Sequence, residues 1–248
     1  MTLTDDQIER YARHLILKEI GGPGQQKLLK SKVLVIGAGG LGSPLLMYLA
    51  AAGVGTIGII DHDSVDLSNL QRQIVHMTSA IGQDKVTSAK EMIKNINPDI
   101  NVVTYHERLT DDNAEKIISE YDVVADGCDN FTTRFLVNDI CIAQRKPLIS
   151  GALSQFDGQL STFKGYEDTQ PCYRCLVPDH PKGILSCAEA GILGAVAGVV
   201  GTMQAVEVLK ELLNIGDSLA GKLVIYDSLS AASRTIKLPK DPGCKYCH

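Results

Sequence analysis

The stretch Lys32-Val33-Leu34-Val35-Ile36-Gly37-Ala38-Gly39-Gly40-Leu41-Gly42 decides the fold of this chain. Its first half is an apolar run, which is typical of a strand buried on both faces of a sheet. Its second half has the spacing GxGxxG, and a helical pattern from Ser43 to Ala52 follows it. A strand, a glycine loop and a helix in this order bring backbone N–H groups and a helix N-terminus to phosphate groups. The stretch therefore predicts a nucleotide-binding unit.

Strand and helix patterns alternate beyond this unit. We expect strands over residues 56–60, 101–105, 122–126 and 148–150, and helices over residues 85–95, 113–119 and 132–144. This alternation indicates an α/β fold with a doubly wound, Rossmann-like and mostly parallel sheet. After Ser150 the pattern changes, and we expect antiparallel C-terminal strands over residues 159–164, 222–227 and 233–238.

The chain contains no internal repeat and no low-complexity linker, which favours one continuous domain over residues 1–248. Its first part, residues 1–24, is expected to be an N-terminal helical arm. Thr4 and Gln7 have the spacing of a capping box at the start of that arm. We expect the helix to end at Gly21-Gly22-Pro23-Gly24, because glycine and proline commonly stop helices.

Composition narrows the class of protein. The formal net charge of −5 and the lack of a Lys/Arg cluster argue against a nucleic-acid partner. The apolar stretch from Ala190 to Leu213 is interrupted by glycines and a glutamate, so we expect a buried core helix and no membrane partner. Seven cysteines, an odd number, and a polar, acidic N-terminus without a targeting pattern favour a reduced, cytoplasmic setting.

Two CxxC pairs in the C-terminal third predict a structural zinc site. The four cysteines are Cys172, Cys175, Cys244 and Cys247. Four thiolates at this spacing close a tetrahedral shell, so the metal is a clasp over residues 172–247 and catalysis lies elsewhere. His248 is not expected to be a ligand for the same reason, and Cys128 and Cys141 are expected to be core residues.

Charged residues after the second strand identify the kind of nucleotide. Asp61 ends that strand, where an acid can bind ribose hydroxyls, and on this feature alone NAD would be expected. The polar segment Ser68-Asn69-Leu70-Gln71-Arg72-Gln73 and Lys85 then add cations, and Asp129 follows a strand at the carboxyl edge of the sheet. Cations and a carboxylate at a phosphate loop suit a triphosphate with Mg²⁺ better than a nicotinamide.

Taken together, these motifs resemble the bacterial relatives of ubiquitin-activating enzymes, which adenylate the C-terminal glycine of small ubiquitin-like sulfur-carrier proteins. The resemblance covers nearly the whole chain, from Arg10-Tyr11-Ala12-Arg13 to Cys247. It points first to the molybdopterin-synthase adenylyltransferases and next to the thiamine-pathway homologues. It implies a nucleotidyltransferase that uses ATP and Mg²⁺ and carries a structural Zn²⁺.

The resemblance also implies roles for individual residues. It assigns the ATP site to Gly40, Asp61, Ser68, Asn69, Leu70, Gln71, Arg72, Lys85, Asp129 and Asn130. Within that set it makes Arg72, Lys85 and Asp129 catalytic, with Asp129 binding Mg²⁺. It further implies a homodimer in which Arg13 reaches the triphosphate of the neighbouring subunit.

Cys187 lies in Leu185-Ser186-Cys187-Ala188-Glu189, a segment that in this family can face the acyl-adenylate. In some relatives the matching cysteine forms a covalent link to the carrier, and in molybdopterin-type members it is dispensable for adenylation. A thiol role and plain packing both stay open for Cys187. Some relatives continue into a sulfurtransferase domain, but this chain stops at His248, so we expect sulfur from a separate sulfurtransferase.

The expected partner is a ubiquitin-like sulfur carrier with a Gly-Gly C-terminus, and the small subunit of molybdopterin synthase is favoured. The same reaction on a thiamine-pathway or tRNA-thiolation carrier stays open. Two other classes also stay open, namely an NAD-dependent oxidoreductase and a non-catalytic zinc-dependent scaffold.

Overall fold

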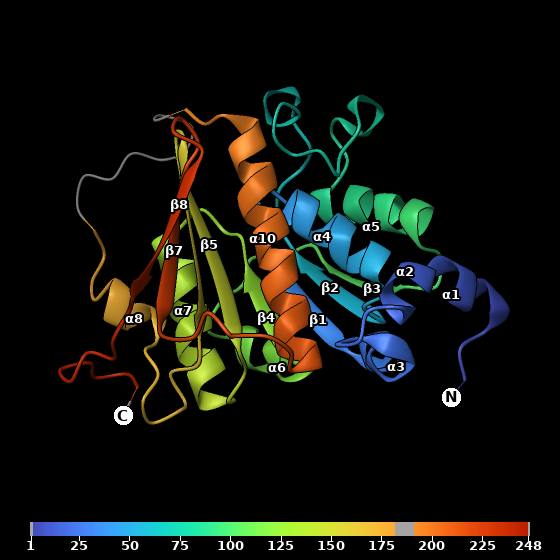
Figure 1. Ribbon diagram of the computed structural model, residues 1–248. Coiled ribbons are helices and arrows are strands. Elements are labelled where there is room, and N and C mark those ends of the chain that lie inside the picture. The colour runs from blue at the N-terminus through green and yellow to red at the C-terminus, as the bar shows by residue number, and fades with distance from the viewer. Residues whose placement is uncertain (1, 182–190, 248) are drawn as a thin grey trace.

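An eight-stranded mixed sheet forms the centre of the protein (Figure 1). The computed structural model describes residues 2–181 and 191–247, and the strands lie in the order β3-β2-β1-β4-β5-β6-β7-β8. The parallel part contains β1 (Lys32–Ile36), β2 (Thr56–Ile60), β3 (Asn101–Tyr105), β4 (Val123–Asp126) and β5 (Leu148–Ser154). The antiparallel part adds β6 (Asp157–Phe163), β7 (Lys222–Asp227) and β8 (Ala232–Lys237). The predicted α/β sheet with antiparallel C-terminal strands is confirmed.

Helices cover both faces of the sheet (Figure 1). The layer on one face contains α3 (Gly21–Lys30), α4 (Gly42–Ala52), α5 (Lys85–Ile96) and α10 (Gly194–Leu213). The layer on the other face contains α6 (Ala114–Ser119) and α7 (Phe131–Ala143). Shorter elements are α1 (Asp5–Arg10), α2 (Ala12–Leu15), α8 (Tyr173–Leu176) and the 3-10 turns η1 (Leu67–Asn69) and η2 (Thr78–Ala80). No helix among the described residues is both long and apolar enough to cross a membrane.

Strand β1 shows why its sequence is apolar throughout. Val33 and Val35 pack into the layer of α4 and α10, whereas Leu34 and Ile36 pack into the layer of α6 and α7. All four side chains are buried. Each such burial stabilises the fold by about 1.5–3 kcal/mol, so a polar residue on either face would be costly.

Strand order places two loops together at the carboxyl edge of the sheet. The chain runs from β1 to β2 and β3 on one side and then crosses to β4 and β5 on the other. In doubly wound sheets, ligands bind at the carboxyl ends of the strands where this reversal occurs. The loops after β1 and β4 meet there, since a Cβ atom on Gly37 would lie 3.3 Å from the carbonyl oxygen of Gly127.

The N-terminal residues fold differently from the expectation in one respect. The capping box at Thr4 and Gln7 is confirmed, with the N–H of Gln7 donating to the Thr4 hydroxyl at 3.2 Å. The expected helix end at residues 21–24 is wrong, because α3 begins at Gly21. Gly21 has a φ of +54°, which lets the chain turn, and Pro23 lies in the first turn of α3, where its missing N–H costs little.

Candidate active site

The glycine loop between β1 and α4 is closed too tightly for side chains at two of its positions. Gly37 has a φ of +91°, a conformation that glycine adopts without strain. A Cβ atom on Gly42 would lie 2.0 Å from the carbonyl oxygen of Gly37. The loop therefore turns directly into the N-terminus of α4, whose free N–H groups favour an anion.

Asp61, at the end of β2, holds this loop in place. Its Oδ2 accepts the N–H of Ala38 at 2.8 Å, and its Oδ1 accepts the N–H of Asp63 at 2.9 Å. The side chain is half-buried. The structure thus brings the predicted ribose-binding carboxylate into direct contact with the glycine loop.

Lys85 is the first residue of α5, and its ammonium group pairs with Asp63, two residues after Asp61. Lys85 is buried, and its Nζ donates to Oδ2 of Asp63 at 2.8 Å. Burial alone would raise the pKa of Asp63, but the hydrogen bond and charge of Lys85 outweigh it and lower that pKa. A continuous series of contacts therefore joins Lys85 to Asp63, Asp61 and the glycine loop.

The segment from Ser68 to Arg72 lies between the glycine loop and α10. A Cβ atom on Gly40 would lie 3.5 Å from Cγ of Arg72, and Nη1 of Arg72 donates to the carbonyl of Ser68 at 3.1 Å. A Cβ atom on Gly194, at the start of α10, would lie 2.2 Å from the carbonyl oxygen of Gln71. The remaining predicted residues of the segment, Asn69 and Leu70, are half-buried on the same turn. The stem of Arg72 is thereby positioned beside the predicted phosphate loop.

Asp129 and Asn130 follow β4. The side chain of Asp129 is exposed, as a magnesium ligand needs to be before the ion binds. Asn130 is the N-cap of α7, with its Oδ1 accepting the N–H of Thr133 at 2.9 Å. Because the loops after β1 and β4 touch, both residues lie at the same sheet edge as Asp61.

A buried ion pair that sequence reasoning missed fixes the loop carrying Asp129. Asp126 is 1% exposed, and its Oδ2 lies 3.2 Å from Nη1 of Arg134. Nη2 of Arg134 also donates to the carbonyls of Cys128 at 2.6 Å and Gly151 at 2.7 Å. Burial alone would lower the pKa of Arg134, but Asp126 outweighs it and raises that pKa, so the guanidinium stays charged. The pair ties the loop after β4 to β5.

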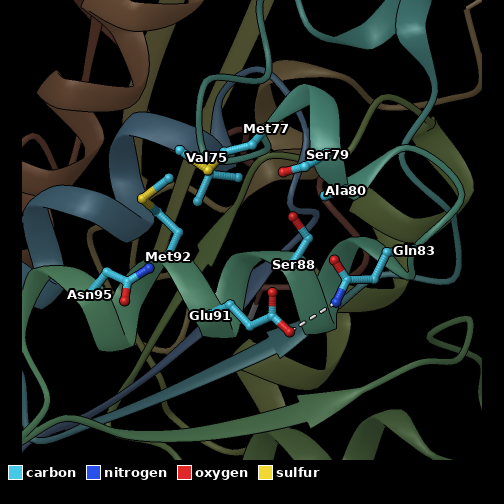
Figure 2. Close-up of a pocket in the computed structure, with 9 residues that line it drawn as sticks. All are labelled: Val75, Met77, Ser79, Ala80, Gln83, Ser88, Glu91, Met92 and Asn95. Carbon is cyan, nitrogen blue, oxygen red and sulfur yellow. Dashed lines mark hydrogen bonds between the residues drawn. The ribbon is translucent and has the colours of Figure 1, made fainter.

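His76 supports the glycine loop from the α5 side. Its Nε2 lies 2.9 Å from the carbonyl of Ala38, and its Nδ1 lies 2.9 Å from the hydroxyl of Ser88. A carbonyl only accepts, so Nε2 carries the proton and Nδ1 accepts from Ser88. Burial lowers the pKa of His76, which keeps the ring neutral. Ser88 also lines a small pocket between η2 and α5, where Gln83 donates to Glu91 (Figure 2).

Arg13 is not brought to the glycine loop of its own chain. It is exposed on α2, next to Tyr11, whose hydroxyl accepts a hydrogen bond from Asn97 at 2.9 Å. Asn97 also donates to the carbonyl of Ala50, in the last turn of α4. Since α4 starts at the glycine loop and Ala50 lies in its last turn, these contacts hold Tyr11 at the end of α4 opposite that loop.

Four cysteines form a cluster that fits zinc. They are Cys172, Cys175, Cys244 and Cys247, and their sulfur atoms all lie within 4.8 Å of one another. The Sγ–Sγ distances are 3.9 Å for Cys172–Cys175, 3.7 Å for Cys172–Cys244 and 3.5 Å for Cys175–Cys247. A tetrahedral ion with Zn–S bonds of about 2.3 Å needs edges of about 3.8 Å, whereas a disulfide needs about 2 Å.

Close packing and an ion pair surround this cysteine cluster. A Cβ atom on Gly165 would lie 2.5 Å from Cβ of Cys172, so only glycine allows this approach. Arg174, between two of the cysteines, donates to both carboxylate oxygens of Asp139 on α7 at 2.8 and 2.7 Å. Burial raises the pKa of Cys172 and that of Cys247, the latter to about 11, whereas backbone hydrogen bonds outweigh burial at Cys244 and lower its pKa. The residues present therefore can hold a structural zinc ion.

The other two cysteines that the structure describes, Cys128 and Cys141, pack against one side of the sheet. Cys141 is buried in the α6–α7 layer, as predicted, and Cys128 is half-buried against the same layer. Burial raises the pKa of both thiols. Cys187 and His248 lie outside the described residues.

Comparison with known proteins identifies the family. Residues 11–246 match the ThiF family, which is nearly the whole chain. The chain belongs to the ThiF family. At 44% identity over 252 residues it resembles the "Sulfur carrier protein adenylyltransferase" of Thermus thermophilus, with 100% of this chain and 93% of that protein covered. At 46% identity over 248 residues it resembles the "Adenylyltransferase and sulfurtransferase MOCS3" of Anopheles gambiae, covering 99% of this chain. The ThiF-family chain spans only about half the length of its MOCS3 relatives, 56% in this case.

Solved structures show the same ThiF-type fold. The chain is similar to E. coli MccB with ATP, at a TM-score of 0.82 and 23% identity, covering 96% of this chain and 74% of that one. It is similar to MccB in complex with N-formylated MccA at a TM-score of 0.84 and 22% identity, covering 96% and 75%. At these identities the likeness shows the fold alone.

Sequence reasoning missed four residues that shape the site of this ThiF-family chain. They are Asp63, His76, Asp126 and Arg134. One signal was present for the last of them, because Arg134 follows the helical spacing of the apolar residues of α7 and therefore had to be buried. A buried arginine requires an acid nearby.

Proposed function

We propose that this protein uses ATP to adenylate the C-terminal glycine of a small ubiquitin-like sulfur-carrier protein. One observation carries the proposal. In this ThiF-family chain Asp61 binds the glycine loop, Arg72 lies against that loop, and Lys85 is joined to Asp61 through Asp63, with Asp129 at the same sheet edge. The relative from Thermus thermophilus bears the name of this activity.

Within this proposal, the nucleotide lies on the glycine loop. Gly40 contacts it from the loop beside Arg72, Asp61 binds the ribose, and the segment from Ser68 to Arg72 binds the phosphates together with Lys85. Two cationic side chains at a loop followed by a helix N-terminus suit three phosphate groups. Asp129 and Asn130 complete the site, and Mg²⁺ held by Asp129 would neutralise phosphate charge.

The reaction requires no base from the protein. The terminal glycine carboxylate of the carrier is ionised at neutral pH, and its oxygen attacks the α-phosphorus of ATP. A new O–P bond forms, the bond to the pyrophosphate oxygen breaks, and the products are an acyl-adenylate and pyrophosphate. Arg72 and Lys85 then stabilise the charge that moves onto the leaving pyrophosphate.

We further propose that the enzyme works as a homodimer in which Arg13 acts on the partner subunit. Arg13 is exposed, and Tyr11, two residues before it, is bonded through Asn97 to the end of α4 opposite the glycine loop. Apolar side chains are exposed beside it, namely Ile16 and Leu17, and others are exposed beside the Arg72 segment, namely Leu67, Ile74 and Met77. Apolar surface of this kind is typical of an interface between subunits.

Mixing two inactive variants tests this arrangement. An arginine of this kind contributes about 10³–10⁵-fold in rate, so Arg13→Ala should lose nearly all turnover and still fold. When Arg13→Ala and Asp129→Ala proteins exchange subunits, a hybrid dimer contains one intact site, and partial activity should return. If exchange is demonstrated and no activity returns, Arg13 does not act across subunits.

The carrier protein is proposed to be the small subunit of molybdopterin synthase, which would place the reaction in molybdenum cofactor biosynthesis. Carriers of thiamine biosynthesis and tRNA thiolation are the alternatives. Mass spectrometry of each candidate carrier after incubation with ATP and Mg²⁺ distinguishes them, since only the true substrate gains an adenylyl group. A Cys187→Ala variant in the same assay tests whether that thiol is needed for adenylation.

Residues 1–248 are proposed to act as one adenylating domain in the cytoplasm, with residues 1–24 as an arm and residues 172–247 held by zinc. A separate sulfurtransferase would supply the sulfur. An NAD-dependent oxidoreductase is the second candidate, because Asp61 and the GxGxxG loop also suit a dinucleotide. Thermal unfolding with ATP or NAD separates the two, and a scaffold without activity would respond to neither.

A further inference from the structure

The segment that carries Arg13 is fastened to the body of the protein on both sides of that residue. Tyr11, two residues before Arg13, is buried, and its hydroxyl accepts a hydrogen bond from Nδ2 of Asn97 at 2.9 Å. Directly after Arg13, Nδ1 of His14 lies 2.9 Å from Oε1 of Gln25, a fully buried residue of α3. These contacts hold the backbone of residues 11–14 against α3 and the end of α5.

Tyr11 packs directly against the backbone at the end of α4. Gly53 follows that helix with a φ of +84°, and a Cβ atom there would lie 2.6 Å from the hydroxyl oxygen of Tyr11. The same Cβ would lie 2.7 Å from Nε2 of Gln25, which donates to the carbonyl of Ala52 at 2.9 Å. Only glycine at position 53 allows both side chains to come so close to α4.

Asn97 joins the elements that meet at this point. It is fully buried, and besides the Tyr11 hydroxyl its Nδ2 donates to the carbonyl of Ala50 at 2.9 Å. Its Oδ1 accepts the N–H of Asp99 at 3.3 Å. Both amide hydrogens and the amide oxygen are therefore used, which leaves this side chain one orientation.

Arg13 itself differs from its neighbours on this segment. It is exposed, and it forms no hydrogen bond or ion pair with the residues that the structure describes. Arg10, by contrast, donates to the carbonyl of Ile96 at 3.0 Å. An unpaired guanidinium on a fixed backbone loses less freedom on binding than one on a mobile segment. Arg13 is thus the arginine that this segment leaves available for a ligand outside its own fold.

We propose that Asn97 is a positioning residue for Arg13. By holding the hydroxyl of Tyr11, it sets the place from which Arg13 reaches the site of the partner subunit. This inference rests on the proposed action of Arg13 across subunits. A displacement of about 1 Å in a group that acts on the reaction can cost about 10²-fold in rate. Loss of the Asn97 bond should therefore slow the reaction in the partner subunit and leave the site of its own subunit intact.

The test begins with Asn97→Leu, which has a similar volume and no amide hydrogens. The carbonyl of Ala50 keeps a partner in this variant, because it also accepts the N–H of Gly53 at 3.1 Å. Turnover of the full chain is measured as exchange of labelled pyrophosphate into ATP, with Mg²⁺ and a carrier ending in Gly-Gly that the wild type adenylates. Asn97→Leu should exchange about 10–100-fold more slowly than the wild type.

Mixed dimers then show in which subunit the defect acts. After subunit exchange with Asp129→Ala, Asn97→Leu should recover up to about a quarter of the wild-type rate, because half of the dimers then pair one intact site with one intact arm. After exchange with Arg13→Ala it should gain nothing, since neither subunit then has a working arm. The reverse pattern, with recovery only beside Arg13→Ala, would place the defect in the site of its own subunit and overturn the inference. Recovery with neither partner would overturn it too.

Tyr11→Phe is the second variant and decides the matter where Asn97→Leu does not fold. It keeps the ring against Gly53, removes only the hydroxyl, and should be about tenfold slower with the same pattern in mixed dimers. The matched control is Tyr121→Phe. The hydroxyl of this buried tyrosine lies 3.1 Å from that of Tyr105, and a Cβ atom on Gly58 would lie 2.2 Å from it. Tyr121→Phe should exchange at the wild-type rate, and equal rates for the two tyrosine variants would overturn the inference.

Failure of the inference can be told apart from failure of the proposed function. If the wild type gives no exchange with any carrier, or if Arg13→Ala and Asp129→Ala do not complement each other after subunit exchange, the proposed function fails along with the inference. If those two variants complement each other and the Asn97 and Tyr11 variants do not behave like Arg13→Ala, only the inference fails.

Discussion

Replacing Arg134 by methionine should destabilise the protein strongly, because it leaves a buried carboxylate without its partner. The carboxylate of Asp126 is 1% exposed and lies 3.2 Å from the guanidinium, which also bonds the carbonyls of Cys128 and Gly151. Removing one member of a buried pair costs about 3–5 kcal/mol. For a domain of this size each kcal/mol lowers the unfolding temperature by about 2–4 °C, so a fall of about 6–20 °C is expected.

Differential scanning calorimetry of three variants measures this effect and its origin. The control is Arg145→Met, since Arg145 is exposed and donates one hydrogen bond, to Tyr166 at 3.3 Å, and should cost less than about 1 kcal/mol. The double variant Arg134→Met with Asp126→Asn should recover part of the loss, because the unpaired charge is gone.

The Arg134 variant should also bind ATP with Mg²⁺ more weakly, because Cys128 and Asp129 lie on the loop that Arg134 fixes to β5. Titration of ATP at a temperature where the variant stays folded measures this. The reasoning is refuted if Arg134→Met and Arg145→Met unfold within about 2 °C of each other, a difference worth about 1 kcal/mol or less.

Three further predictions concern the parts around the site. Burial lowers the pKa of His76 in the folded protein below its unfolded value of about 6.5. As the pH falls, the unfolded chain therefore takes up a proton at this ring before the folded chain does. The free energy of unfolding should then decrease as the pH drops through about 6.5, by at most about 1.4 kcal/mol per pH unit. Urea unfolding at pH 7.5 and 5.5 should show this loss, and a His76→Gln variant with the same pH slope would contradict it. Gly201→Ala should destabilise the protein, because the new Cβ would lie 2.3 Å from the carbonyl oxygen of Leu41, against which α10 packs. Gly198→Ala on the same helix places its Cβ in open space and should stabilise the protein by about 0.5–1 kcal/mol. Thermal unfolding compares the two, and equal effects would be evidence against this packing. Metal analysis should find one zinc ion per chain, and chelation should lower the unfolding temperature; a zinc-free chain of unchanged stability would show that the cysteine cluster is not a metal clasp.

The parts of the fold that depend on local pattern could be predicted. Strand β1 is apolar on both faces because helices cover both faces of the sheet. Asp61 and Asp129 follow the ends of parallel strands, so the topology alone brings them to the same edge of the sheet. Side-chain pairing between elements could not be predicted in the same way. The pair of Asp126 and Arg134 joins β4 to α7 inside the core, and no periodicity reports which buried charge meets which.

Two other results depended on three-dimensional placement. The glycines of residues 21–24 are compatible with either a helix end or a helix start, and only the φ of +54° at Gly21 and the position of Pro23 decide between them. Arg13 resembles a catalytic residue in sequence, yet Tyr11, two residues before it, is bonded through Asn97 to the end of α4 opposite the glycine loop. A sequence pattern alone does not give this placement, on which the proposed role of Arg13 in a second subunit rests.

Carrier-dependent exchange of labelled pyrophosphate into ATP tests the central proposal most directly. The protein, Mg²⁺, ATP and a carrier ending in Gly-Gly should give rapid exchange, because formation of the acyl-adenylate is reversible. Removing the terminal glycine of the carrier, or changing Lys85 to alanine, should abolish it. Failure of every Gly-Gly carrier to support exchange, or exchange that proceeds equally without a carrier, would contradict adenylation of a carrier glycine by this site.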